Sequence, residues 1–191
     1  MKRLLFGLLM LVVTAACRPE PTYYGTLWPS PQQADDFTLT SATGPVSLSD
    51  YADKVVLLYF GYTFCPDVCP ATLADLGHVL RAMGDDAGQI QVIMVTVDPE
   101  RDTPAQLAEY VTHFYPTFIG LSGTEAEIAA VAEQYGVFYE RHEGTAATGY
   151  LIDHTARVFV IDRKGEYWLS FPFEMDREQM QADLENVLRQ R

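Results

Sequence analysis

The feature that most constrains the fold is a continuous apolar run at residues 55–60, followed closely by Cys65 and Cys69. The run combines β-branched and aromatic residues, and such runs suit a central strand covered on both faces. After the second cysteine, residues 71–83 place apolar side chains at helical spacing. The sequence therefore predicts two thiols at a strand-to-helix junction, which indicates either redox chemistry or a soft metal.

The remaining pattern alternates strands with helices along the chain. Thr103 and Thr124 each stand three residues before a Gln or Glu, which is the signature of a helix N-terminus. The predicted strands are 36–40, 45–48, 90–97, 118–121, 137–139, 156–161 and 167–171, and the predicted helices are 71–83, 103–114, 124–135 and 176–188. This order predicts an α/β, thioredoxin-like fold with an N-terminal β-hairpin extension and a central mixed sheet flanked by helices.

The first 33 residues are unlike the rest of the chain. A basic head, a short apolar run and small residues before Cys17 predict a lipoprotein-type signal peptide at 1–16, with Cys17 lipidated. Thr14 stands where such signals usually carry Leu, and the alternatives are an ordinary signal peptide or an uncleaved membrane anchor. Residues 17–33 are Pro-rich and predict a tether, leaving 34–191 as the domain. We expect export and membrane anchoring, with the domain on the outer face, either periplasmic or extracytoplasmic.

Charge narrows the range of partners. The chain carries a formal net charge of −13, and the basic Lys2 and Arg3 lie within the predicted signal. Such an acidic domain is a poor partner for nucleic acid or for an anionic membrane surface. The acidity is compatible with steering toward a cationic patch or metal cations, and equally with simple solubility.

The cysteine spacing is one residue longer than in a thioredoxin-type exchanger. With Cys17 lipidated, Cys65 and Cys69 are the only remaining cysteines, so they predict a site more than a structural disulfide. Residues four apart share one face of a helix, which brings the two sulfurs close. Pro66 and Pro70 predict a turn at 65–67 and a regular helix from 68–70. A disulfide between the two cysteines is sterically possible.

Two thiolates suit Cu(I) and also zinc. A structural zinc site normally takes four protein ligands, and the sequence does not cluster four candidates. Two thiolates with one imidazole suit copper, so the third ligand is a histidine. His78 and His113 are assigned to surface or packing roles, and His142 borders a polar loop, with contact to the site as the alternative. His154 lies just before the strand at 156–161, and in thioredoxin-like proteins the turn before that strand faces the cysteine motif.

His154 is therefore the predicted third ligand, with a simple turn histidine as the alternative. Asp153 is predicted to orient a metal-binding side chain without touching the metal itself, or else to cap the turn. Asp98 lies at the end of a predicted strand, on the sheet edge where the cysteines are expected. Asp98 either helps to shape the site or its partner surface, or simply stabilises the turn beside Pro99.

Three motifs together resemble the Sco/SenC family: GYTFCPDVCP at 61–70, VDPERDTP at 97–104 and DHT at 153–155. The resemblance covers roughly residues 37–188. It implies a copper-binding, thioredoxin-like assembly factor for cytochrome c oxidase that delivers copper to the dinuclear site of subunit II, or reduces the cysteines of that site. The family's ligands fall on Cys65, Cys69 and His154.

The leading functional prediction is a metallochaperone for Cu(I) or Cu(II). Its expected partners are cytochrome c oxidase subunit II, another periplasmic copper chaperone, and the membrane through the lipid anchor. The alternative is a thiol-disulfide reductase in which Cys65 or Cys69 is the attacking thiolate, so enzymatic activity stays open. A peroxidase is disfavoured because the sequence places no arginine next to Cys65.

Overall fold

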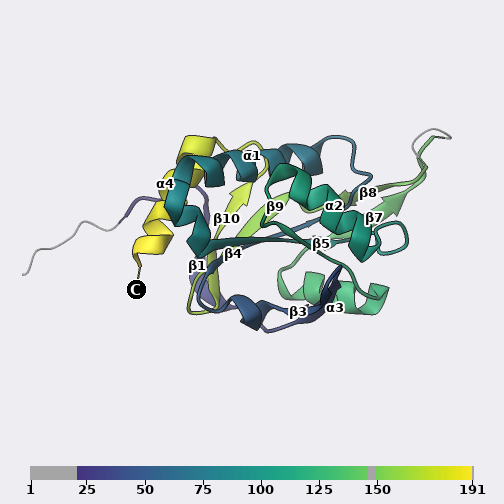
Figure 1. The fold of residues 1–191 in the computed structure, drawn as a ribbon, viewed down its shortest axis with the longest axis horizontal. Helices are drawn as coiled ribbons and strands as arrows, with labels where there is room; N and C mark the ends of the chain where they lie inside the picture. The colour runs from purple at the N-terminus through teal and green to yellow at the C-terminus, as the bar shows by residue number, and fades with distance from the viewer. Residues whose placement is uncertain (1–20, 146–148, 191) are drawn as a thin grey trace, which may run out of the picture.

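The computed structural model describes residues 21–145 and 149–190 and is built on a six-stranded mixed sheet (Figure 1). In spatial order the strands are β1 (Thr26–Gln33), β10 (Glu166–Pro172), β9 (Arg157–Ile161), β4 (Val55–Gly61), β5 (Ile90–Thr96) and β6 (Ile119–Leu121). Neighbours on the β4-β5-β6 side run parallel, and neighbours on the β4-β9-β10-β1 side run antiparallel. Every residue of β4 and β5 is buried, as expected for central strands.

Helices cover both faces of this sheet. They are α1 (Val68–Met83), α2 (Pro104–Phe114), α3 (Glu125–Gln134) and α4 (Arg177–Arg189), with the 3-10 helices η1 (Leu48–Tyr51) and η2 (Gly84–Gln89). Helix α1 contacts both α2 and α4, and α3 lies across the opposite face (Figure 1). The predicted capping boxes at Thr103 and Thr124 are present and begin α2 and α3.

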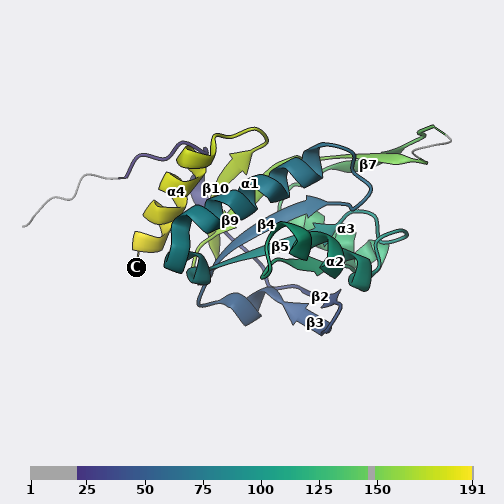
Figure 2. The ribbon, with the colours of Figure 1, turned by 45° about the horizontal axis from the view of Figure 1, so that its top comes forward.

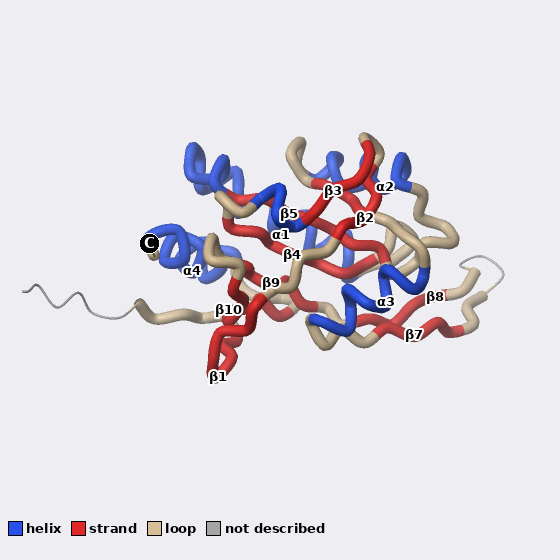
Figure 3. Tube along the Cα trace, turned by 90° about the horizontal axis from the view of Figure 1, so that it is seen from below, coloured by secondary structure: helices blue, strands red, loops and turns tan. Residues whose placement is uncertain are grey.

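Two β-hairpins form separate two-stranded sheets beside the central sheet. The predicted N-terminal hairpin is confirmed as β2 (Thr38–Ser41) paired with β3 (Gly44–Ser47). A second hairpin, β7 (Tyr139–His142) paired with β8 (Leu151–His154), projects from the body of the molecule (Figures 2 and 3). Its strands lie within a region for which the sequence predicts only an extended piece and a polar loop.

The N-terminal segment is tied to the domain by backbone pairing and by one buried acid. Strand β1 pairs with β10, although most of its side chains are exposed. Asp183 of α4 is fully buried, and its carboxylate accepts hydrogen bonds from the backbone N–H groups of Tyr24 and Gly25. Residues 26–33 of the predicted tether therefore form an edge strand of the sheet.

The two ends of the described chain lie on the same side of the molecule, beside α4 (Figure 1). The β7–β8 hairpin lies at the other side in all three views, and the start of α1 lies toward that side in Figures 1 and 2. None of the helices in the described part of the chain has the length and apolar character needed to cross a membrane. The predicted signal peptide and Cys17 lie outside the described residues.

Candidate metal centre

The cysteine loop begins where β4 ends. The N–H of Cys65 donates to Tyr62 O at 3.3 Å, and α1 begins at Val68, as the two prolines predict. Pro70 is the third residue of α1, a position whose N–H has no helical acceptor, so the ring costs no hydrogen bond. Cys69 is fully buried in the first helical turn, and Cys65 is half-buried before it.

His154, the last residue of β8, completes a cluster with the two cysteines. Its Nε2 lies 3.3 Å from Cys69 Sγ, and the ligand atoms of all three residues lie within 4.8 Å of one another. The rings of Tyr59 and Tyr62 stand edge-on to the imidazole at 6.0 and 5.9 Å between centroids. His154 thus lies at a strand end and not in a turn, and the described chain contains no cis peptide bond.

The two thiols have opposite electrostatic environments, and neither is in a disulfide. The pKa of Cys65 is lowered to about 4, mainly by the hydrogen bond from the Cys69 thiol and also by His154 and the N–H groups of Asp67 and Cys69. Burial is the largest influence on Cys69 and raises its pKa, and adjacent Cys65 raises it further. At neutral pH the pair therefore consists of a half-exposed thiolate and a buried thiol.

This donor set fits a soft metal ion. Two sulfurs and one imidazole nitrogen match the preference of copper, and a closed structural zinc site would need a fourth ligand. Within the part of the chain that the structure describes, these three residues are the one group of three or more potential ligands that converges. Binding would require both thiols to lose their protons.

Gly61 allows the close packing behind Cys69. A Cβ at this position would lie 2.9 Å from Cys69 Sγ and 2.8 Å from the Tyr59 ring, closer than real Cβ atoms approach other atoms. Met94 of β5 lies on the same side, at 3.3 Å from that Cβ position. The Cys69 sulfur is consequently held against β4 and β5 in a mainly apolar pocket.

Asp98 takes part in a network next to the centre. Its carboxylate binds the Arg101 guanidinium and accepts a hydrogen bond from the Tyr150 hydroxyl at 2.7 Å. The Arg101 guanidinium in turn lies over the rings of Tyr150 and Phe64, at 3.5 and 4.6 Å from their centroids. Asp98 therefore connects the second motif to the cysteine loop and to the hairpin through Arg101.

Asp153 has a different place from the one that its sequence position suggests. Its side chain is 79% exposed and pairs with His142 across the hairpin at 3.1 Å. Successive residues of a strand point to opposite faces, so Asp153 points away from the face that carries His154. The group beside His154 Nδ1 is the carbonyl of Thr155, at 3.4 Å.

The structure adds one residue that the sequence reasoning missed. Asp102 is fully buried and accepts hydrogen bonds from the N–H and hydroxyl of Thr63 and from the Thr96 hydroxyl. Burial, the largest influence, raises the pKa of this carboxyl. Asp102 thereby fixes the loop two residues before Cys65 to the end of β5, and its position in the VDPERDTP motif was the available signal.

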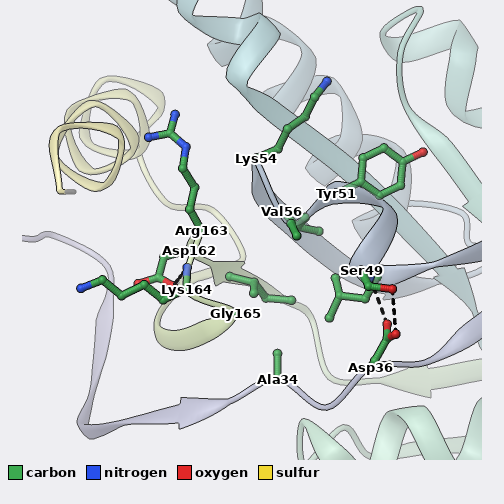
Figure 4. Close-up of a pocket in the computed structure, with 13 residues that line it drawn as sticks. Ala34, Asp36, Ser49, Tyr51, Lys54, Val56, Asp162, Arg163, Lys164 and Gly165 are labelled. Atoms are coloured by element: carbon green, nitrogen blue, oxygen red, sulfur yellow. Dashed lines mark hydrogen bonds between the residues drawn. The ribbon is translucent and has the colours of Figure 1, made fainter.

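Among the cavities of the described chain, two with different linings lie away from the cysteine cluster. One, of about 210 Å³, lies near the start of β4 and the β9–β10 turn, with Lys54, Arg163 and Lys164 around it (Figure 4). A larger one, of about 550 Å³, lies between α3, the second motif and the β7–β8 hairpin. Neither is lined by Cys65, Cys69 or His154.

The fold and the cluster together define a class: a thioredoxin-like domain that carries a Cys-Cys-His centre at its first strand-to-helix junction. The chain belongs to the SCO1/SenC family, which matches residues 28–189. The SCO2-like protein RC0895 of Rickettsia conorii is 36% identical over 153 residues, covering 79% of this chain and 75% of the relative.

Two solved structures show the same architecture. Apo Sco1 from Thermus thermophilus is 40% identical, with a TM-score of 0.78 and coverage of 88% of this chain and 98% of that one. ScoI of Bradyrhizobium japonicum, solved with copper bound, is 41% identical, with a TM-score of 0.74 and coverage of 82% and 99%. The predicted thioredoxin-like fold and the family resemblance are confirmed.

Proposed function

We propose that this protein is a copper metallochaperone that holds Cu(I) or Cu(II) with Cys65, Cys69 and His154. The observation that carries the proposal is the convergence of two sulfurs and one imidazole nitrogen within 4.8 Å. Copper is the cargo that this donor set suits best, and the copper-bound ScoI relative supports the assignment. Half-exposed Cys65 gives a partner's thiolate access to the ion for ligand exchange.

The recipient in this proposal is the dinuclear copper site of cytochrome c oxidase subunit II, in keeping with the family. Another periplasmic copper chaperone is the proposed donor of the ion. The domain would be exported and attached to the membrane through lipidated Cys17. The described chain begins beside α4, on the side of the molecule away from the start of α1 (Figure 1).

A second function, thiol-disulfide reduction, is favoured by the electrostatics of the pair. The Cys65 thiolate, with a pKa of about 4, would attack a disulfide of the partner, forming a mixed disulfide and releasing one partner thiolate. Cys69, after losing its proton, would attack the Cys65 sulfur and release the second thiolate. The partner gains two electrons, and this domain is left with a Cys65–Cys69 disulfide.

Anaerobic copper titration of the reduced domain, followed by X-ray absorption, tests the first function. The expected result is one copper per chain with two sulfurs and one nitrogen as protein ligands. A domain that takes up no copper but readily forms the Cys65–Cys69 disulfide would reject the metallochaperone and favour the reductase.

A further inference from the structure

Tyr59 brings a buried hydroxyl to the back of the metal centre. It is 0% exposed, and its Oη makes no hydrogen bond of normal geometry with any described residue. A buried hydroxyl without a partner is unfavourable, so such a group calls for an explanation. The sequence gives no hint of it, because Tyr59 lies within the apolar run of β4.

The position of Cys69 supplies that explanation. Gly61 has no side chain to separate the Tyr59 ring from Cys69 Sγ, and a Cβ there would lie within 3 Å of both. The side-chain polar groups within reach of the Tyr59 hydroxyl are Cys69 Sγ and the Thr72 hydroxyl. Thr72 already donates its own proton to Val68 O at 2.9 Å, so it competes with Cys69 only as an acceptor.

Cys69 Sγ needs a hydrogen-bond donor from within the protein. Its residue is fully buried, so a donor must come from the protein groups packed around it. His154 Nε2 is 3.3 Å away, but in the proposed site this nitrogen binds the ion and cannot also donate to the sulfur. The donors left beside the sulfur are the Tyr59 hydroxyl and the backbone N–H of Tyr62.

We propose that the Tyr59 hydroxyl donates a hydrogen bond to Cys69 Sγ and so sets the strength of this sulfur as a copper ligand. This inference rests on the proposed copper function and deepens it. Tyr59 is a positioning residue, because it acts on the ion through Cys69. A hydrogen bond to a ligating sulfur withdraws electron density from it and favours the reduced ion, which for copper is Cu(I).

The test is Tyr59→Phe, which removes only the hydroxyl. Tyr135→Phe is a matched control: Tyr135 Oη is also buried without a partner, but its ring packs against Phe60 and Phe159 on the other face of the sheet. In competition with a chromophoric Cu(I) chelator, Tyr59→Phe should weaken Cu(I) binding about tenfold, the effect of one hydrogen bond to a charged group. Tyr135→Phe should stay within about twofold of wild type.

Two further readouts distinguish ligand tuning from packing. The sulfur-to-Cu(II) charge-transfer band should move to longer wavelength in Tyr59→Phe alone. In the copper-free protein equilibrated with glutathione, Tyr59→Phe should shift the dithiol–disulfide balance about threefold toward disulfide, because the thiol form loses its donor. Thr72→Val should leave all three readouts unchanged.

Equal values for Tyr59→Phe and wild type would overturn the inference, as would equal shifts in Tyr59→Phe and Tyr135→Phe. A shift in Thr72→Val as large as that in Tyr59→Phe would assign the hydroxyl to Thr72 and also overturn it. A wild-type protein that binds no copper would overturn the proposed function, and the glutathione equilibrium would then still test the hydrogen bond to Cys69.

Discussion

At the scale of single residues, His154 separates the two proposed functions. We expect His154→Ala to weaken Cu(II) retention by more than about a hundredfold, since even partners outside the ligand shell contribute tenfold to a hundredfold. Disulfide formation between Cys65 and Cys69 needs no imidazole and should persist. Equilibrium dialysis against a Cu(II) buffer measures the first effect, and thiol titration after mild oxidation measures the second.

His113→Ala is the control for that experiment, because His113 lies on α2 and packs against Phe114. It should retain Cu(II) as the wild type does. Unchanged Cu(II) affinity in His154→Ala would count against the imidazole as a ligand.

The different environments of the two thiols predict a pH profile for the copper-free protein. Because the pKa of Cys65 is lowered to about 4, its thiolate persists to far lower pH than that of an ordinary thiol, whose pKa is about 8.5. Its alkylation rate by iodoacetamide should stay level from about pH 8 to pH 5 and fall only near pH 4. Mass spectrometry should find Cys65 modified before buried Cys69; a rate that falls tenfold per pH unit below pH 8 would contradict this.

At the scale of elements, the junction of β4 with α1 depends on Gly61. Gly61→Ala would place a Cβ 2.9 Å from Cys69 Sγ and 2.8 Å from the Tyr59 ring, so these buried side chains would have to shift. Overpacking of this kind costs about 1–3 kcal/mol, so we expect urea unfolding of the reduced domain to show a loss of that size. Gly88→Ala is the control: a Cβ there meets nothing within 4 Å and should change stability by less than about 0.5 kcal/mol.

The elements that the sequence predicted are those with a strong periodic or capping signal. The central strands, the four helices and the β2–β3 hairpin follow from apolar runs, helical spacing and the Thr103 and Thr124 caps. Strand β1 was not predicted from the sequence, because Pro29 and Pro31 are unusual in strands and most of its side chains are exposed. It pairs with β10 at the sheet edge through its backbone. Hairpin β7–β8 was not predicted either, because most of its side chains are polar or exposed.

The residues of the candidate centre could be predicted where a metal-binding residue type stands at an informative place in the sequence. Cys65 and Cys69 follow from spacing, and His154 follows from its place before a core strand. Asp102 stands in a motif, but its hydrogen bonds to Thr63 and Thr96 appear only in the folded chain. Tyr59 carries no sequence signal, because its closeness to Cys69 depends on the packing around Gly61. Asp153 adjoins His154 in sequence but lies on the opposite face of β8, which only the strand register decides.

At the scale of the whole molecule, the described chain begins on the side away from the candidate metal centre. There Asp183 binds its first residues to α4. Three hydrogen bonds from backbone N–H groups of Tyr24 and Gly25 reach its carboxylate, at 2.8 to 3.1 Å. The residues just before β1 are bound to α4, and β1 itself pairs with β10. Residues 24–33 of the predicted tether are therefore held on the domain by Asp183 and by the pairing of β1 with β10.

The pH dependence of stability tests whether burial or hydrogen bonding has the greater influence on the pKa of Asp183. Burial is the largest influence on Asp183 and raises its pKa above the ordinary 3.8, while the Gly25 and Tyr24 N–H groups lower it. The folded state therefore holds the proton more tightly than the unfolded state, so this contribution to stability is present at acid pH and lost as pH rises through the folded pKa. The unfolding free energy of wild type minus that of Asp183→Asn should accordingly fall as pH rises from about 4 and level off above the folded pKa. Urea titrations across pH 4–7 measure this difference, and a difference that grows with pH would mean that the N–H groups outweigh burial.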